Sequence, residues 1–168
     1  MTEGRLRALA SRDFRRFLIG LFISIIGTQM QRVAVAWQMY QLTGSAVSMG
    51  LLGLARVTPV LLFAVGGGVL ADAFDRRRMM LVTQSALALS SVGLATLTYT
   101  GHVSPAVVYG AVALSGLASA FDAPARGSLV ALLVPRADLP NALSLNGVIF
   151  ELGTVIGPAV GGLLILSL

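Results

Sequence analysis

Three charged residues lie inside long apolar stretches of this sequence: Arg32, Arg56 and Glu151. An unpaired charge at the centre of a membrane-spanning helix costs about 2.5–3.5 kcal/mol on insertion scales. Such residues are therefore expected to face a wet cavity or one another, and they commonly bind a substrate, an ion or a proton. We interpret them as a cationic cavity with one titratable acid, Glu151, suited to an anionic or amphipathic molecule and a coupling proton. Three glutamines of the first apolar segment could line the same cavity: Gln29, Gln31 and Gln38.

The same charges also admit a purely structural interpretation. Counted at about 1.5 Å per residue from the start of their apolar segments, Arg56 and Glu151 both lie roughly 15 Å deep, near the middle of a bilayer. An ion pair between them would join two helices and do nothing else. Residue chemistry alone leaves both interpretations open.

A second charged cluster stands between two apolar segments, in the stretch 66–78. It begins with three glycines, contains the acids Asp72 and Asp75, and ends with three consecutive arginines. Glycines let two helices approach closely, and the charges cannot remain in hydrocarbon. The stretch is therefore expected to be a tight turn at a membrane surface. The plain alternative is a basic loop that only fixes the orientation of the protein.

The composition is that of a membrane protein. Of the 168 residues, 56% are hydrophobic and 11% are charged, whereas about a quarter of the residues of a soluble domain are charged. Long segments without period-2 alternation argue against a β-barrel. The sequence therefore predicts an all-α, polytopic membrane protein. Its basic residues gather at segment ends without interleaved aromatic residues, which argues against a nucleic-acid partner.

Five apolar segments are long enough to cross a hydrocarbon core of about 30 Å, which requires about 20 helical residues. The residues before them, 1–16, form a basic tail, and we expect this tail to lie on anionic cytoplasmic lipid with Phe14 among its apolar contacts. The expected helices span 17–40, 46–71, 79–99, 105–123 and 139–168.

The charges of the connections alternate along the chain. The connections 41–45 and 100–104 hold no arginine, whereas 72–78 and 124–140 hold several. Cytoplasmic loops carry the excess of basic residues. The tail and the two arginine-containing connections are therefore predicted to be cytoplasmic, in a multi-pass protein of the plasma membrane.

The spacing of Gly68, Asp72, Arg76 and Arg77 resembles the loop between helices 2 and 3 of major facilitator superfamily transporters. The acid Asp75 before the basic pair is similar to the drug and siderophore exporter branch, as are the stretches 37–44 and 153–162. The resemblance implies the first five helices of a secondary transporter that works by alternating access. Within the superfamily it is most like a proton-coupled exporter of small amphipathic molecules such as drugs or siderophores.

The resemblance also implies a role for charges on the cytoplasmic side. Asp72, Arg76 and Asp122 would form a latch that holds the outward-open state, with Gly68 and Arg77 in the same loop motif. The plain alternative for these charges is an exposed ion pair, worth less than about 1 kcal/mol.

Glycines recur at close-packing spacing in the second and fifth segments, and small residues let helix backbones touch in lipid. In the second segment they include Gly50 and Gly53. The run in the fifth segment resembles the antiporter motif on helix 5 of proton-linked drug exporters, and chemically it predicts a bendable, closely packed helix. It comprises Gly153, Gly157, Pro158, Gly161 and Gly162.

The sequence carries no constellation for catalysis or for a cofactor. A phosphate-binding Gly-Lys-Ser/Thr loop is missing, the serines lack an adjacent base, and one histidine with no cysteine makes a metal site improbable. The predicted partners are a small-molecule substrate, a coupling proton and the lipid bilayer.

Transporters of this type consist of two halves built from inverted repeats, and this chain covers only part of one half. The C-terminal helices of the same transporter are therefore expected to complete it. The alternative is a short membrane interaction protein that associates through its glycine-rich faces and has no transport activity of its own.

Overall fold

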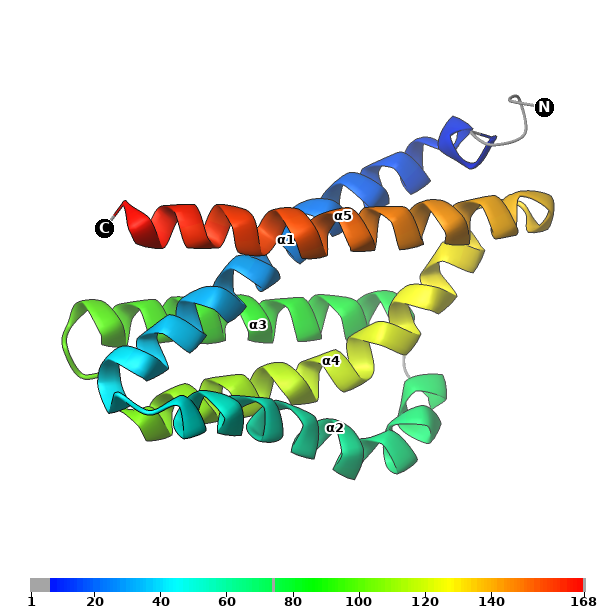
Figure 1. Ribbon diagram of the computed structural model, residues 1–168. Coiled ribbons are helices and arrows are strands. Elements are labelled where there is room, and N and C mark those ends of the chain that lie inside the picture. The colour runs from blue at the N-terminus through cyan, green and yellow to red at the C-terminus, as the bar shows by residue number, and fades with distance from the viewer. Residues whose placement is uncertain (1–6, 74, 168) are drawn as a thin grey trace. The chain divides into compact units, whose positions relative to one another are not determined.

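The computed structural model describes residues 7–73 and 75–167, with side chains described except at 7, 64–73, 76, 122–125 and 128. The described residues form five long α-helices and two short 3₁₀ helices, and they contain no strand (Figure 1). In chain order the elements are η1 (Arg7–Ala10), α1 (Arg12–Thr43), α2 (Ala46–Ala73), α3 (Arg76–Tyr99), α4 (Pro105–Leu133), η2 (Arg136–Asp138) and α5 (Leu139–Leu166).

All five expected helices are present, and four of them extend beyond the predicted bounds, α1 and α4 by the most. Helix α1 starts at Arg12 rather than at 17 and ends at Thr43. Helix α4 runs through position 124 to Leu133, so the first part of the expected loop 124–140 is helical. The physical reason is packing, because Val130 is fully buried in a core that helical geometry creates.

Glycine ends the helices on the side where the connections carry no arginine. Gly44 follows α1 with φ +61°, and Gly101 follows α3 with φ +72°. Glycine enters this left-handed region without steric cost and commonly terminates helices in this way. Both connections are consequently short.

Four of the described helices are long and apolar enough to cross a membrane, and α4 adds a shorter apolar stretch, Pro105–Phe121. Large apolar side chains such as Ile23, Leu62 and Leu89 are more than half exposed. Exposed apolar surface of this extent requires a lipid environment. The chain is an all-α, multi-pass membrane protein. The four spans are Arg12–Thr43, Ala46–Phe63, Arg77–Tyr99 and Arg136–Leu166.

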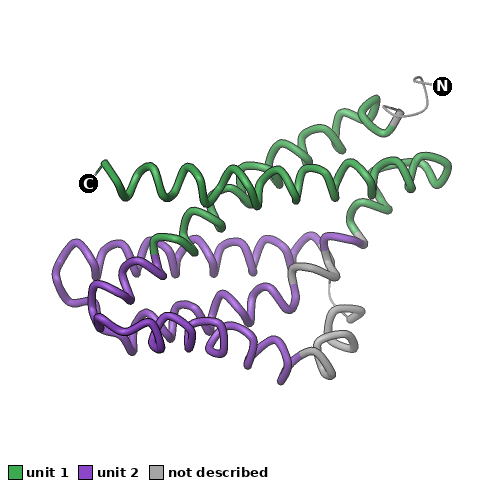
Figure 2. Tube along the Cα trace, viewed as in Figure 1, with its two compact units in different colours: residues 1–34, 128–168 green, residues 35–127 purple. Residues whose placement is uncertain are grey.

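The chain divides into two compact units (Figure 2). Unit 1 comprises residues 1–34 and 128–168, and unit 2 comprises residues 35–127. The core of unit 2 draws on all four helices that enter it, and it contains Val35, Met39, Leu52, Leu94 and Val108. The core of unit 1 joins η1 and the start of α1 to the end of α4 and the start of α5 through Ala8, Phe14, Leu18, Val130, Val134 and Ala142.

The core of unit 1 corrects the expectation for the tail. Phe14 was expected to face lipid, but its side chain is fully buried in protein. The adjoining Ser11 hydroxyl donates to the Leu133 carbonyl over 3.1 Å, which ties the start of α1 to the end of α4. Arg12, Arg15 and Arg16 are exposed. The described part of the tail is therefore an integral part of unit 1 whose charged side chains, the three arginines and Asp13, are exposed.

Contacts between helices show which helices run in the same direction. In unit 1, Gly153 of α5 lies against Ile25 of α1, and Gly161 lies against Met30. Because the residue numbers rise together, α1 and α5 are parallel. The same holds for α2 and α4 in unit 2, as described below. Parallel pairs of this kind are expected when each connection reverses the direction of the chain across a membrane.

Candidate functional site

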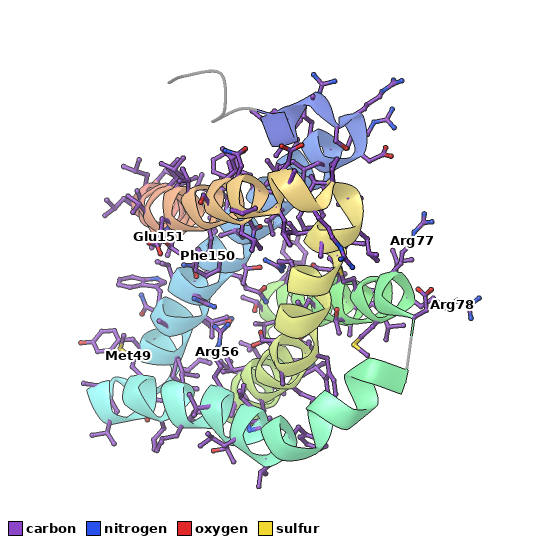
Figure 3. The ribbon with its side chains drawn as sticks, turned by 90° about the vertical axis from the view of Figure 1, so that its right-hand side faces the viewer. Met49, Arg56, Arg77, Arg78, Phe150 and Glu151 are labelled. Atoms are coloured by element: carbon purple, nitrogen blue, oxygen red, sulfur yellow. The ribbon has the colours of Figure 1, made fainter. Side chains whose placement is uncertain are left out.

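Arg56 lies in α2 and is half-buried. Figure 3 shows it on the side of α2 that faces other helices of unit 2, whereas Arg77 and Arg78 point outward at the start of α3. Within the described part of unit 2, the Arg56 guanidinium has no hydrogen-bond or ion-pair partner. A guanidinium carries five donors and always bears its charge. The Arg56 guanidinium therefore has hydrogen-bond donors without an acceptor among the described residues of unit 2.

Gly116 of α4 is the point of closest approach to Arg56. A Cβ atom placed on Gly116 would collide with the Arg56 carbonyl oxygen, and it would lie 3.0 Å from the carbonyl carbon and 3.2 Å from Cα. Small residues allow such backbone contact between membrane helices. Helices α2 and α4 therefore touch backbone to backbone at the residue that carries the charge.

Two further contacts fix α2 against α4. The Tyr109 hydroxyl donates to the Ser48 carbonyl over 3.0 Å, and the rings of Phe63 and Phe121 lie 6.4 Å apart between centroids. Together with the contact at Gly116, these pairs rise in residue number along both helices. The two helices are parallel, and Arg56 lies between the two outer contacts.

Glu151 lies in the middle of α5 in unit 1 and is exposed, beside the half-exposed Phe150 (Figure 3). Its backbone carbonyl accepts a hydrogen bond from the Thr154 hydroxyl over 2.7 Å. Arg56 belongs to the other unit, so the pairing of Arg56 with Glu151 stays a prediction.

The polar residues of α1 differ in how far neighbouring helices cover them. Arg32 is exposed and Gln31 is half-buried. Gln29 was expected to line a cavity, but only 8% of it is exposed because it is covered by α5. The Gln38 amide donates to the Thr98 hydroxyl of α3 over 2.5 Å. The expectation for Gln29 was wrong because the helical period places it on the face that packs against α5, together with Ile25.

The glycine run of α5 forms the contact with α1. Gly153, Gly157 and Gly161 are buried and follow one another at intervals of four residues, so they share a helix face. A Cβ atom at Gly157 would collide with the Gln29 side chain and lie 3.0 Å from the Ile26 carbonyl oxygen. The close packing predicted for these three glycines is present.

The other members of the run behave differently. A Cβ atom at Gly162 would meet no atom within 4 Å, so Gly162 does not contribute to the contact with α1. Helix α5 continues without interruption through the half-buried Pro158. Gly50 and Gly53 of α2 were expected to pack closely, but a Cβ atom on either one would also meet no atom within 4 Å. Spacing alone misplaced them because it does not show which face of α2 meets a neighbour.

The residues of the expected latch lie outside the described side chains, with one exception. Gly68, Asp72, Arg76 and Asp122 belong to this undescribed group, so the latch stays a prediction. Arg77 is described and exposed at the start of α3.

Asp75 has a structural role that the sequence comparison of this loop did not indicate. It is the N-cap of α3, where its carboxylate accepts a hydrogen bond from the backbone N–H of Arg78 over 2.9 Å. Aspartate is favoured at this position because it satisfies a free N–H and offsets the positive end of the helix. Its place directly before a basic, then apolar, segment is the signal that sequence reasoning could have used.

Sequence reasoning missed Gly116 and Tyr109. Gly116 is buried, but it stands alone in the described part of α4 without a second close-packed glycine, so no repeat draws attention to it. Tyr109 is one of three tyrosines, and nothing in its neighbourhood in the sequence reveals that its hydroxyl reaches α2.

Comparison with known proteins identifies a family and several curated relatives. The model of the family described as transmembrane secretion effector matches residues 4–168. The chain is 27% identical over 150 residues to the staphyloferrin A transporter of Staphylococcus aureus (strain NCTC 8325 / PS 47), covering 89% of this chain and 38% of that protein. It is 30% identical over 148 residues to the multidrug efflux pump Tap of Mycolicibacterium fortuitum, covering 84% of this chain and 36% of that pump.

A third relative is the enterobactin exporter EntS of Shigella flexneri, to which the chain is 28% identical over 152 residues, covering 90% of this chain and 37% of that exporter. The chain thus spans well under half the length of these curated relatives. No solved structure matches it. Because the family model covers nearly every residue, the chain belongs to the transmembrane secretion effector family of major facilitator superfamily transporters.

Proposed function

We propose that this chain forms the first five helices of a secondary active exporter of small amphipathic molecules such as drugs or siderophores. The observation that carries the proposal is Arg56, a half-buried charge in the middle of a membrane-crossing helix with no partner among the described residues of unit 2. A charge kept at such a position commonly serves transport. The named activities of the three relatives, which are siderophore transport or export and drug efflux, support the same function.

The proposed mechanism is alternating access. The transported molecule binds in a cavity to which Arg56 and Arg32 contribute positive charge and Gln31 contributes hydrogen bonds, while Glu151 carries the coupling proton. Asp72, Arg76 and Asp122 hold the outward-open state from the cytoplasmic side, with Gly68 and Arg77 in the same loop. The rest of the transporter supplies the opposite wall of the cavity, as expected from the two-halved construction of such proteins.

The length of the native polypeptide tests whether this chain acts as part of a longer transporter. We expect an antibody raised against residues 72–78 to detect, in membranes of the source cell, a band of more than twice the 17.4 kDa of this chain. A native band at 17.4 kDa would contradict the proposal of a single-chain transporter.

The latch is tested by Asp72→Asn and Arg76→Ala in the complete transporter, expressed in a host that lacks its own efflux pumps. We expect each variant to insert normally and to lower dye efflux at least about tenfold, because a lost charge-assisted interaction of this kind is worth that factor or more. Arg78→Ala is the matched control, since Arg78 is exposed and lies outside the latch. Normal efflux by both latch variants would remove the latch from the mechanism.

Proton coupling is tested at Glu151. Glu151→Gln keeps the size of the side chain and removes its titration. We expect efflux by this variant to become insensitive to an imposed proton gradient in liposomes, whereas the unmodified protein accelerates when the gradient is applied. An unchanged response to the gradient would assign proton coupling to another residue.

The orientation in the plasma membrane can be tested by cysteine labelling, because these 168 residues contain no cysteine and any cysteine elsewhere in the complete transporter can first be replaced by serine. Single substitutions Arg12→Cys and Tyr99→Cys place one thiol at each expected side of the membrane, and both positions are exposed. With a cytoplasmic N-terminus, a membrane-impermeant maleimide added to intact cells labels Tyr99→Cys and leaves Arg12→Cys unlabelled until the cells are opened. The reverse pattern would invert the proposed topology.

A further inference from the structure

The depth of Arg56 limits what its guanidinium can bind. Arg56 follows the start of α2, Ala46, by about ten residues, which corresponds to about 15 Å along the helix axis. In a hydrocarbon core of about 30 Å this places its Cα atom near the middle, far from the phosphates of either lipid leaflet. Apart from the carboxylate of the protein's own Glu151, an anion that reaches this guanidinium must therefore be carried into the protein by a solute.

The backbone around Arg56 is held in place by α4. Pro59 lies within α2, and because proline has no N–H, the carbonyl of Ala55 loses its helical donor. The helix is thus weakened beside Arg56. The contact between Gly116 and the Arg56 backbone supports α2 at this weakened turn, so Gly116 fixes the position from which the guanidinium extends.

The polar groups that flank Arg56 on the same two helices are already engaged. The Thr58 hydroxyl donates to the Leu54 carbonyl over 2.8 Å, and the Ser115 hydroxyl donates to the Val112 carbonyl over 2.7 Å. The Tyr109 hydroxyl is bonded to Ser48. In the described part of unit 2, none of these hydroxyls accepts a hydrogen bond from the Arg56 guanidinium, so its N–H donors remain available for another acceptor.

We propose that Arg56, positioned by the backbone contact at Gly116, binds an oxyanion group of the transported molecule, so that this exporter transports amphipathic carboxylates and sulfonates faster than cationic molecules of similar shape. A planar guanidinium pairs with such groups through two parallel hydrogen bonds, and it does so more strongly in a low-dielectric site. A cationic molecule would meet an unpaired like charge there. This inference rests on the export function proposed above and specifies its substrate class.

Two xanthene dyes of similar shape test the inference in the complete transporter reconstituted in phosphatidylcholine liposomes: fluorescein, which is anionic, and tetramethylrhodamine ethyl ester, which is cationic. We expect the unmodified protein to export fluorescein. Arg56→Gln should lower fluorescein export by about tenfold or more without lowering export of the cationic dye. Arg56→Lys keeps the charge but cannot make two parallel hydrogen bonds, so its fluorescein export should lie between that of the unmodified protein and that of Arg56→Gln.

Gly116→Ala tests the positioning role, with Gly110→Ala in the same helix as its control, since a Cβ atom at Gly110 would meet nothing within 4 Å. We expect Gly116→Ala to lower the ratio of fluorescein export to cationic dye export, whereas Gly110→Ala leaves this ratio unchanged. A purely structural role of Gly116 would lower both dyes equally and leave the ratio as it was, which would overturn this part of the inference.

Four outcomes separate the inference from the function on which it rests. Export of only the cationic dye by the unmodified protein, or equal losses of both dyes in Arg56→Gln, would overturn the anion site and leave the exporter in place. Restoration of fluorescein export by combining Arg56→Glu with Glu151→Arg would make Arg56 a partner of Glu151 and would likewise overturn the site. Failure of the unmodified protein to export either dye or the named substrate classes of its relatives would contradict the proposed function itself.

Discussion

The two parallel helix pairs, α1 with α5 and α2 with α4, achieve close contact in different ways. The first pair uses a row of three glycines on α5, Gly153, Gly157 and Gly161, which lie against α1 over two turns. The second pair touches at a single glycine, Gly116, and the residue it meets is the charged Arg56. A row of glycines therefore holds one pair, and one glycine with side-chain contacts on either side holds the other.

This difference indicates how each pair responds to change. In the α1–α5 pair, the close contact is repeated at three glycines, so a shift that relieves one of them is opposed by the other two. In the α2–α4 pair, the close contact occurs once, at Gly116, and the Tyr109–Ser48 hydrogen bond and the Phe63–Phe121 contact lie on either side of it, so a local shift at Gly116 leaves both flanking contacts in place. We expect the α1–α5 pair to act as a fixed structural element and the α2–α4 pair to set the position of the Arg56 guanidinium.

The largest expected effect is that of Gly157→Leu in the α1–α5 pair. A side chain there would collide with Gln29 and the Ile26 backbone, and forced overpacking costs about 3 kcal/mol or more. We expect the variant to yield little monodisperse protein in detergent. Gly162→Leu, which enters open space in the same helix, should purify normally. Equal yields of the two variants would show that the row of glycines does not hold the pair together.

A smaller loss of stability is expected for Gly116→Ala. One added methyl meets the Arg56 carbonyl, and a strained contact of this size costs about 1–3 kcal/mol. The free energy of unfolding, measured by titration with sodium dodecyl sulfate, should fall by that amount relative to Gly110→Ala. If Gly116→Ala destabilised the protein as much as Gly157→Leu, the two pairs would be equally rigid and the comparison would not hold.

Tyr109→Phe should lower the free energy of unfolding by about 1 kcal/mol, because it removes one hydrogen bond to Ser48 and leaves the ring in place. The control is Tyr99→Phe, since Tyr99 is 94% exposed and should show no change. A loss well above this value would mean that side-chain contacts, and not Gly116, dominate the α2–α4 pair.

The smallest effect is expected for Thr98→Val, which removes the acceptor of the Gln38 amide while keeping the shape of the side chain. Hydrogen bonds between membrane helices average about 0.6 kcal/mol. Thr96→Val is the control, because the Thr96 hydroxyl bonds only within its own helix, to Val92. A difference above about 1.5 kcal/mol between the two would mean that the contact of α1 with α3 contributes as much as the glycine of α4.

The sequence alone predicted the number and class of the helices, because the length of an apolar segment directly reflects the thickness of the membrane. The end of α4 was misplaced because the proline at position 124 suggested a break. Membrane helices tolerate proline where neighbouring helices or polar groups satisfy the freed backbone. The burial of Val130 and Val134, which stabilises the extension, depends on residues of η1 and α5 that only the fold brings near.

The candidate site was predicted in part. Arg56 and the three α5 glycines could be found because a charge in an apolar segment and a repeat of four are visible in the sequence. Gly116 could not be found, since a single glycine forms no repeat. Gly50 and Gly53 do stand at a repeat spacing, but a Cβ atom on either one would meet no atom within 4 Å. Which face of a helix is buried depends on the neighbouring helices, and the local sequence does not contain that information.

The pairing of α1 with α5 also has a consequence for how the protein is made. The contacting residues Ile25 and Gly153 are roughly 130 positions apart, and a ribosome adds about 5–20 residues per second. Helix α1 must therefore wait in the bilayer for on the order of ten seconds, with the amide of Gln29 uncovered, before the helix that buries it has been synthesised. Faults in the glycine row should consequently escape the insertion step and be detected late, by the proteases that remove unassembled membrane proteins.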